Sequence, residues 1–422
     1  MQAQRDRGFL LDEKHAMSLL AELNENISQA EKLVHKTFRP RETQLTLVPL
    51  MTKAGKVSKM AQLKGETKKV RLSDEEYEKA SANPNEHLVR CDSEPFNLGS
   101  RKQIGEYLVD FGWKPTKFTP TGQPIVDEKV LSKIKDIPEA AVIAKYLMLQ
   151  KRIAQITSWF KEVGGDGRVR GFVNTNGAVT GRMTHSHPNM AQVPSTGSPY
   201  GKECRQCWTV MDGYKLVGID ASGLELRMLA HYMNDEGFTY ELLNGDIHTA
   251  NQMAAGLESR NQAKTFIYAL LYGAGDAKLG TVVGGNADDG GRLRQSFFDN
   301  LPAFKVLKDR VARAAKRGYL KGLDGRKLFV RSEHAALNTL LQGAGAIVMK
   351  KGLVILNDKM SGMDAHFVAN VHDEWQIEAL EDVSQRVGEL GVEAIEQAGL
   401  EFNLRCGLTG EYNVGNNWAD TH

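Results

Sequence analysis

The sequence has few cysteines, no excess charge of either sign and no long apolar run. Four cysteines in 422 residues are too few and too scattered for a disulfide framework, which indicates a reducing compartment. Lysine and arginine number 54 against 52 aspartates and glutamates, so any strongly basic surface must be local. No apolar run approaches the ~20 residues that span a bilayer, and no signal peptide follows Met1. We therefore expect a cytoplasmic protein without membrane association.

Two of the cysteines, Cys204 and Cys207, form a CxxC pair. A closed structural zinc site usually takes four ligands, and the sequence has no second pair of this kind. The two interpretations are a zinc site and a pair of half-buried thiols, of which we favour the thiols. The chain is long enough to bury a large core and to divide into two or three lobes.

The first part of the chain predicts a mostly helical lobe that ends near residue 155. Residues 8–35 and 140–159 carry apolar residues at helical spacing. Between them, residues 39–71 contain nine lysines and arginines against two glutamates, and residues 74–94 contain seven acids against two basic residues. This insertion is interpreted either as a solvated, mobile segment or as a basic loop that reaches nucleic acid or a partner protein.

Carboxylates end two apolar strand-like runs in the second part of the chain. Asp220 follows Leu216–Ile219 and precedes a helical pattern that begins at Leu224. Asp373 and Glu374 lie between two further apolar runs, at the tip of an expected hairpin. A lone charge at the end of a buried strand is costly, and divalent cations that bridge two such acids remove the conflict. Asp220 and Asp373 together therefore predict a metal site, although a surface turn would also explain Asp373 and Glu374.

A cationic and aromatic face is predicted for the segment Arg260–Gly275, whose helical pattern ends at Gly273. Arg260, Lys264, Tyr268 and Tyr272 recur every four residues, which drifts only ~40° per step around a helix. Because four residues rise ~6 Å, two cations and then two rings match a nucleoside triphosphate lengthwise. His248 adds an upstream phosphate donor. The alternative is an amphipathic helix that has a solvated basic edge and core tyrosines.

The segment Gly164–Pro194 is rich in glycine, asparagine, threonine and proline and predicts short strands and turns. Arg182, Asn189 and Gln192 are donors that can reach nucleic-acid backbone or minor-groove acceptors. Exposed polar turn residues would look the same, so the sequence leaves both interpretations open.

Together these motifs resemble the family A DNA polymerases, and most closely the replicative polymerases of short-tailed bacteriophages. The residues Asp220–Arg227, Arg260–Gly273 and His372–Glu374 are similar to the three catalytic motifs of that family, in the same order. The resemblance implies an α/β (α+β) right-hand fold with an antiparallel palm sheet, helical fingers and a helical thumb. The implied boundaries are 1–155 for the thumb with an insertion at about 40–96, 156–232 and 338–422 for the two parts of the palm, and 233–337 for the fingers.

The resemblance also implies two-metal nucleotidyl transfer to a primer 3′-hydroxyl, with primer-template DNA and deoxynucleoside triphosphates as substrates. Asp220, Ala221 and Asp373 would hold two Mg²⁺ ions, and Glu374 would support them as a catalytic neighbour. The implied nucleotide-binding residues are Arg260, Lys264, Tyr268, Tyr272, His248 and Glu225, with Lys264 also catalytic. The implied DNA-contacting residues are Arg182, Asn189, Gln192, Asn338, Gln342 and His372.

Glu225 has two interpretations. Ser222 and Glu225 match the capping-box pattern, in which Glu225 would bond the helix N-terminus. The resemblance instead gives Glu225 a role in rejecting a ribose 2′-hydroxyl, which we favour. Tyr268, where some family members carry phenylalanine, implies tolerance of a missing 3′-hydroxyl.

The resemblance implies partner proteins, and two alternative functions remain. Phage members usually carry an exonuclease ahead of the thumb, but no acidic exonuclease motif precedes the thumb in this sequence. We therefore expect no exonuclease on this chain, and leave open whether it was removed, is a separate chain or is absent. The insertion lies where one relative binds thioredoxin as a processivity factor, and a helicase-primase is a further candidate partner. The rival functions are a single-subunit RNA polymerase and a catalytically silent DNA-binding scaffold.

Overall fold

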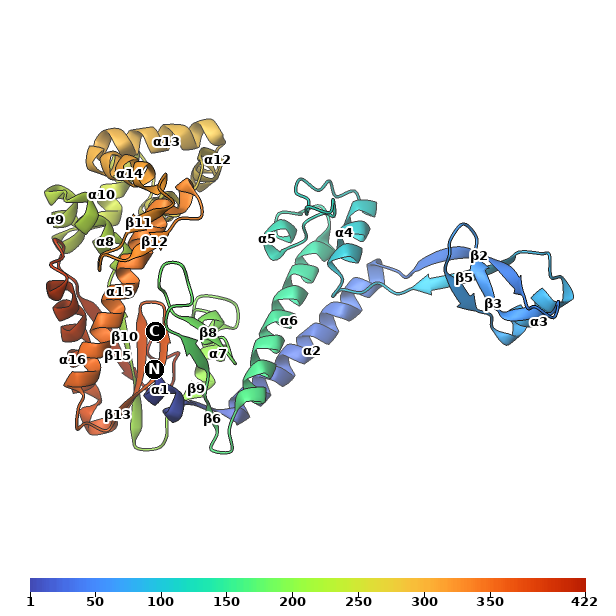
Figure 1. Cartoon of the computed structure of the whole chain (residues 1–422), viewed down its shortest axis with the longest axis horizontal. Coiled ribbons are helices and arrows are strands. Elements are labelled where there is room, and N and C mark those ends of the chain that lie inside the picture. Colours follow the sequence, from blue (N-terminus) through green and yellow to red (C-terminus); the bar gives the residue numbers. More distant parts are fainter. The chain divides into compact units, whose positions relative to one another are not determined.

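The computed structural model describes all 422 residues and divides into two compact units. Unit one contains Met1–Leu20 and Gln155–His422, and unit two contains Ala21–Ala154 (Figure 1). The second boundary falls where the sequence predicted the first lobe to end. The first twenty residues, which we expected in that lobe, instead belong to unit one.

Unit two has a helical part with its own core. Helices α2 (Glu13–Thr37), α4 (Arg101–Asp110), α5 (Glu128–Leu131) and α6 (Pro138–Glu162) contribute side chains to one buried cluster that includes Val34, Phe38, Ile104 and Ile143. The predicted helix over residues 8–35 therefore begins later, at Glu13, because Phe9–Leu11 forms a strand.

The insertion in unit two is a folded sheet, so the expectation of a mobile segment or loop was wrong. Strands β2 (Arg41–Met51), β3 (Val57–Leu63), β4 (Lys69–Arg71) and β5 (Leu88–Glu94) pair antiparallel in the order β4-β3-β2-β5. Helix α3 (Asp74–Ala82) begins with a capping box between Ser73 and Glu76. Leu47, Ala61 and Ala80 form part of a separate small core. Alternating apolar residues along β2 and β3 supply this core, and the high charge of the segment concealed that alternation.

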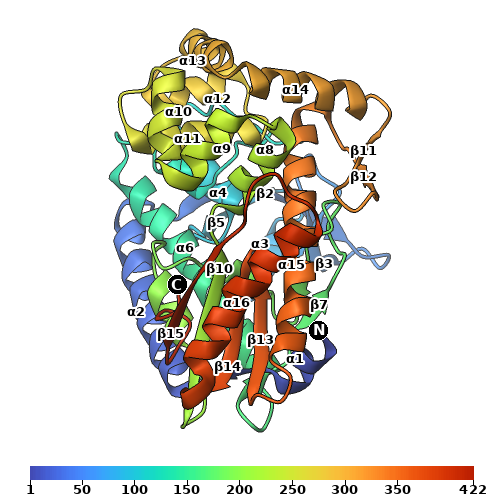
Figure 2. The same cartoon turned by 90° about the vertical axis from the view of Figure 1, so that its left-hand side faces the viewer.

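Unit one is built on an antiparallel sheet of four strands. Its order is β13-β14-β10-β15, with bounds Ala365–Val371, Glu374–Leu380, Tyr214–Ala221 and Gly410–Gly415. Helices α15 (Ala336–Lys359) and α16 (Glu381–Glu401) cover one face of this sheet (Figure 2). Gly388 and Gly391 let α16 approach closely, since an added Cβ would come within 2.3 Å of Tyr412 or Ile219.

A second layer of unit one holds irregular elements and the N-terminal segment. Strand β1 (Phe9–Leu11) pairs with β6 (Arg168–Val169) and β9 (Trp208–Thr209). Phe9 contacts Trp208 and Trp418, with ring centroids 5.3 and 6.0 Å apart. The other elements are α1 (Gln2–Arg7), β7 (Phe172–Asn174), β8 (Thr184–Ser186), η1 (Met190–Gln192) and α7 (Gly201–Gln206). The short strands and turns predicted for Gly164–Pro194 are confirmed.

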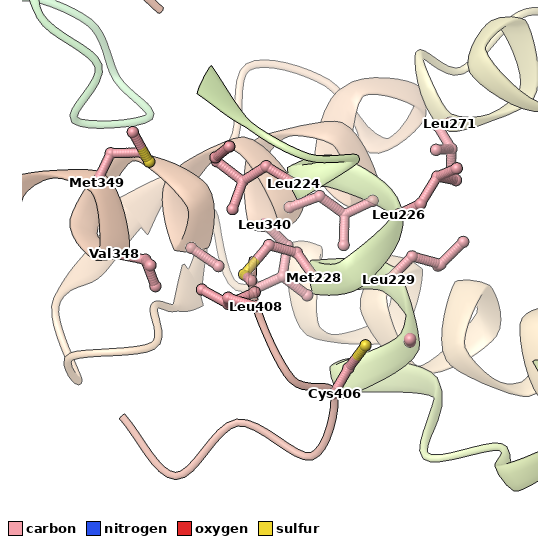
Figure 3. Packing of buried hydrophobic residues seen from close by; sticks show 14 of the residues in the cluster. Leu224, Leu226, Met228, Leu229, Leu271, Leu340, Val348, Met349, Cys406 and Leu408 are labelled. Atoms are coloured by element: carbon pink, nitrogen blue, oxygen red, sulfur yellow. The ribbon is translucent and has the colours of Figure 1, made fainter. Parts of the chain in front are cut away.

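A helical segment connects β10 to α15. Its elements are α8 (Leu224–Met233), α9 (Glu236–Asn244), α10 (Ile247–Ala255), α11 (Arg260–Leu271), α12 (Asp276–Gly280), η2 (Thr281–Val283), α13 (Ala287–Asn300), α14 (Pro302–Ala315), the hairpin β11 (Tyr319–Lys321) and β12 (Lys327–Phe329), and η3 (Glu333–Ala335). Figure 3 shows Leu224 and Met228 of α8 beside Leu340 of α15 in the main core. This packing fixes the start of α8, and so the corner after Asp220, against α15.

Helix α15 is long and apolar enough to cross a membrane, contrary to our expectation that no such stretch exists. Within the fold, 67% of its apolar window, which lies in Glu333–Lys359, is buried inside the protein. A helix that is apolar on most sides is typical of the centre of a large core. The placement of α15 against α8 and α16 accounts for its composition.

Candidate active site

The predicted acids meet at the ends of neighbouring strands. In the register of β10 and β14, Asp220 lies directly opposite Glu374. The backbone N–H of Ala221 donates to the carbonyl of Asp373 at 3.1 Å, which fixes the strand end against the β13-β14 turn. His372 takes a φ of 55° in this turn. The predicted hairpin tip is confirmed, and residues from two distant parts of the sequence form one corner.

Repulsion and burial raise the affinity of this corner for protons or cations. The pKa of Asp220 is raised to about 7 by desolvation and then by the charges of Glu374 and Asp373. Glu411, opposite Asp220 on β15, adds to this rise. Burial also raises the pKa of Asp373, although the charge of Arg182 opposes the rise. The pKa of an acid rises in this way when the nearby positive charge is too weak to offset burial and like charges.

The residues at this corner fit a divalent cation. Carboxylate and carbonyl oxygens, which Asp220, Asp373 and the backbone of Ala221 supply, are the donors that Mg²⁺ prefers. Mg²⁺ usually takes one or two protein carboxylates and fills its remaining positions with water and substrate phosphates. No group of three or more histidine, cysteine, aspartate or glutamate side chains forms a closed cage here. The donor set therefore suits an ion shared between protein and substrate.

Glu374 is held by residues that the sequence reasoning did not identify. The indole Nε1 of Trp418 donates to Glu374 Oε1 at 2.6 Å, and His422 Nδ1 lies 3.3 Å from Oε2. Arg205 lies 3.8 Å from Oε1. Burial alone would raise the pKa of Glu374, but the contacts of His422, Arg205 and Trp418 together lower it. Glu374 is therefore a buried, ionised carboxylate beside Asp220.

Strand β14 carries a row of buried polar residues that begins at this carboxylate. Gln376 donates to Glu374, and Glu378 accepts two hydrogen bonds from Arg168 at 2.9 Å and one from Arg7 at 2.7 Å. Polar residues at every second position of an otherwise apolar strand were the signal in the sequence. They indicated a buried polar face that needs partners.

Glu225 bonds two residues of the site and does not form the capping box. The N-cap of α8 is Gly223 in a left-handed conformation, without a side-chain cap, and Ser222 Oγ is buried with no partner. Glu225 instead accepts from Tyr272 Oη at 2.9 Å and from Arg182 at 3.3 Å. Arg182 also lies 3.7 Å from Asp373. The capping interpretation was wrong because the N-cap is Gly223, one residue after Ser222, and the chain enters the helix through its left-handed conformation.

A pocket of about 400 Å³ is lined by seven of the sixteen predicted site residues. The predicted residues that line it are Arg182, Ala221, Glu225, Tyr268, Tyr272, His372 and Asp373. Desolvation raises the pKa of both tyrosines, and the charge of Glu225 adds to the rise in each. The hydrogen bond from Tyr272 to Glu225 raises the pKa of Tyr272 further. The pocket thus joins the acidic corner to one end of α11.

Helix α11 presents the predicted cationic face. Arg260 bonds Asp246 at 2.6 Å, and both side chains are exposed. The ring of Tyr268 lies 6.5 Å from that of His248 and 6.4 Å from that of Tyr272. Desolvation and then the charges of Arg260 and Lys264 lower the pKa of His248, which places all three near one another.

The other predicted DNA contacts lie outside this pocket. Asn189 and Gln192 are exposed around η1, where the Gln192 carbonyl accepts from Gln155 at 2.6 Å. Asn338 and Gln342 are half-buried one turn apart on α15.

The two CxxC cysteines are free and buried, and Cys207 Sγ donates to the carbonyl of Glu203 at 3.3 Å.

The fold is that of a polymerase domain. The structure matches a solved structure described as the POL domain of Pol1 from M. smegmatis in complex with DNA primer-template and dNTP, with a TM-score of 0.80. The match is 20% identical in sequence and covers 99% of this chain and 68% of that one. It confirms the expected α+β right-hand fold.

The chain belongs to DNA polymerase family A, whose model matches residues 67–420. It is 44% identical over 383 residues to the DNA-directed DNA polymerases of Enterobacteria phage T3 and Escherichia phage T7, covering 80% of this chain and 54% of each relative. It is 30% identical over 359 residues to DNA polymerase I of Pseudomonas aeruginosa, covering 78% of this chain and 39% of that protein. The chain thus spans about half the length of the phage relatives.

Proposed function

We propose that this chain is a template-directed DNA polymerase that adds deoxynucleotides to a primer 3′-hydroxyl during phage genome replication in the host cytoplasm. The observation that carries the proposal is the meeting of Asp220 and Asp373 beside a pocket that also contains Tyr268 and Tyr272 of α11. Acids at one end and a cationic helix at the other suit a substrate with a reacting phosphate and a long anionic tail.

Asp220, Asp373 and the carbonyl of Ala221 would hold two Mg²⁺ ions at the end of β10. When bound, the ions lower the pKa of the primer hydroxyl and neutralise the triphosphate and the leaving pyrophosphate. The contacts from Trp418 and Arg205 keep Glu374 ionised, so that its charge supports the site without competing for a proton.

The triphosphate is assigned to the exposed face of α11. Lys264 acts as a point charge, whereas the guanidinium of Arg260 can fork across two phosphate oxygens after it leaves Asp246. His248 donates a further hydrogen bond from the start of α10. Tyr272 and Tyr268 then meet the base and the sugar.

Glu225 acts as the sugar filter in this proposal. Its carboxylate is held from two sides, by Tyr272 and Arg182, so its position is fixed before substrate enters. A carboxylate held this way rejects a ribose 2′-hydroxyl by contact, and this role separates the proposal from the RNA polymerase alternative. Arg182 and Gln342 on α15 are the candidates for contacts with acceptors in the minor groove.

The same proposal assigns the parts of the fold and their partners. The sheet and α15–α16 form the palm, α9–α14 with the hairpin β11–β12 form the fingers, and unit two forms the thumb. The sheet subdomain, residues 40–96, is the candidate site for a processivity factor, with a thioredoxin-like protein as one candidate. A separate exonuclease chain and a helicase-primase are the remaining candidate partners.

Primer extension with deoxynucleotides and ribonucleotides in Mg²⁺ tests the proposal. We expect extension with deoxynucleotides and its loss, by about 10³-fold or more, in Asp373→Asn. Asp382→Asn, an exposed aspartate on α16, is the matched control and keeps full activity. Faster extension with ribonucleotides would favour the RNA polymerase, and unchanged activity in Asp373→Asn would remove Asp373 from the metal site.

A further inference from the structure

The segment that ends the helical part of unit one is strongly basic. Residues 305–331 contain ten lysines and arginines against two aspartates, in a chain whose net charge is only +2. These residues form most of α14 and the hairpin β11–β12. Most of the cations are exposed, so the segment is a concentrated positive surface.

The hairpin β11–β12 adds aromatic rings to this charge. Tyr319 pairs with Phe329, and Lys321 pairs with Lys327, so these four side chains share one face. Leu320 on the opposite face is 3% exposed, as expected for the side that packs on the core.

The ring of Phe329 is the most open part of this face. Its residue is 65% exposed, although leaving a large ring in water gains nothing for folding. Lys327 Nζ lies 4.8 Å and Arg317 lies 5.8 Å from the centroid of Tyr319. The two cations thus flank one ring and leave the other free to stack.

The turn of the hairpin lies beside the loop that carries Arg182. The guanidinium of Arg326 lies beside Gly181, where an added Cβ would come within 3.1 Å of it. Lys350 on α15 donates to the carbonyl of Gly181 at 2.6 Å. Arg182, the next residue, reaches Asp373. The turn of the hairpin therefore lies near the loop whose Arg182 reaches the acidic corner.

We propose that this face binds single-stranded nucleic acid, with unpaired bases stacked on Phe329 and phosphates held by Lys321, Lys327 and Arg331. Alternating rings and cations are the surface that single strands need, because every base has a flat face and every nucleotide a charge. The identification of the strand as the unpaired template ahead of the primer rests on the proposed function.

Equilibrium binding of an oligothymidylate to the full chain, read by fluorescence anisotropy without nucleotides, tests the proposal. Phe329→Ala weakens binding by about tenfold, since stacking on one ring contributes about that much. Phe329→Trp, which keeps an aromatic ring, retains the affinity of the natural chain. Tyr240→Ala, which removes an equally exposed ring from α9, leaves the affinity unchanged and is the matched control.

The salt dependence separates the phosphate contacts from the stacking. For single strands each phosphate contact contributes about 0.7 to the slope of log K against log salt, so Lys321→Ala with Lys327→Ala flattens the slope by about 1.4. Phe329→Ala lowers the affinity without changing this slope. Thermal unfolding of each variant verifies that the protein remains folded, and Phe329→Leu, which keeps an apolar side chain without a ring, serves if the alanine variant does not fold.

Two outcomes overturn the proposal. One is an oligonucleotide affinity that Phe329→Ala and the lysine pair leave unchanged in folded variants. The other is that the natural chain binds an acidic peptide but no oligonucleotide, and that the Lys321→Ala with Lys327→Ala variant loses the peptide binding. This result would make the face a protein-docking surface. The binding assay needs no catalysis, so it separates the two proposals. If the natural chain does not extend primers but binds the oligonucleotide, and Phe329→Ala weakens this binding, the polymerase function is refuted and the binding site is retained.

Discussion

Asp220 lies directly opposite Glu374 in the register of β10 and β14, with the whole helical segment inserted between the two strands. Like charges opposite each other destabilise a sheet, so this pairing is retained at a cost to folding. Arg205 offsets the charge of Glu374, and Trp418 and His422 contact its two oxygens, while the pKa of Asp220 is raised to about 7. The corner is arranged for a cation that reaches Asp220 and Asp373.

Glu225→Ala tests the sugar filter. Since Glu225 caps no helix end, its removal should leave thermal stability nearly unchanged while it opens space beside Tyr272. We expect ribonucleotide incorporation relative to deoxynucleotide to rise by about tenfold or more, which corresponds to ~1.4 kcal/mol of lost discrimination. The measurement is kcat/KM for single-nucleotide insertion with each sugar. Unchanged discrimination would exclude this role.

Tyr268 sets the response to chain terminators in our account. Its hydroxyl lies in the pocket near Glu225, so it can replace a missing 3′-hydroxyl of the incoming nucleotide. We expect ready use of dideoxynucleotides by the natural chain and a fall of about tenfold or more in Tyr268→Phe. Competition between deoxy and dideoxy substrates in primer extension gives the ratio directly. Strong rejection by the natural chain would refute the assignment.

The buried ion pairs of Glu378 should control the stability of unit one. Glu378 is fully buried and bonded by Arg168 and Arg7. Glu378→Ala leaves two arginines without their partner, which costs about 3–5 kcal/mol. Chemical unfolding measures this change, and Glu381→Ala on the exposed start of α16 should cost under about 0.5 kcal/mol. Equal effects of the two substitutions would show that the buried pairs do not stabilise the fold.

Acid should weaken the sheet subdomain through Glu76. Arg90 bonds this carboxylate at 2.7 Å, and the pKa of Glu76 falls from 4.5 to about 2, chiefly through that bond. A lowered folded-state pKa means that the stabilisation is complete above about pH 4.5 and is lost as the pH falls through about 2.

Hydrogen exchange in β2 and β5 at several pH values measures the acid effect, with Glu76→Gln as the comparison. We expect the protection difference between the natural chain and Glu76→Gln to be largest at pH 6 and to shrink toward pH 2. A difference that is independent of pH would mean that Glu76 acts only through packing or its cap at Ser73.

The part of the site that follows from local sequence could be predicted, because each acid ends an apolar run. Asp220 and Asp373 were found this way, and the spacing of Arg260 and Lys264 gave the face of α11. The partners of Glu374 could not be found, since Trp418 comes from the end of the chain and reaches β14 only in the folded state. The sequence pattern gave a wrong prediction at Ser222, which matched a capping box. The helix is entered instead through Gly223, whose left-handed conformation makes it the N-cap.

Mn²⁺ binding, followed by electron paramagnetic resonance, tests the central claim that Asp220 and Asp373 form one cation site. The complex contains a dideoxy-terminated primer-template and the next nucleotide, so that no chemistry occurs. We predict that Asp220→Asn and Asp373→Asn each weaken Mn²⁺ binding by about tenfold or more, and that the double variant is little worse than either, because the two act as a unit. Full Mn²⁺ affinity in either single variant, or an equal loss in Asp382→Asn, would contradict the account.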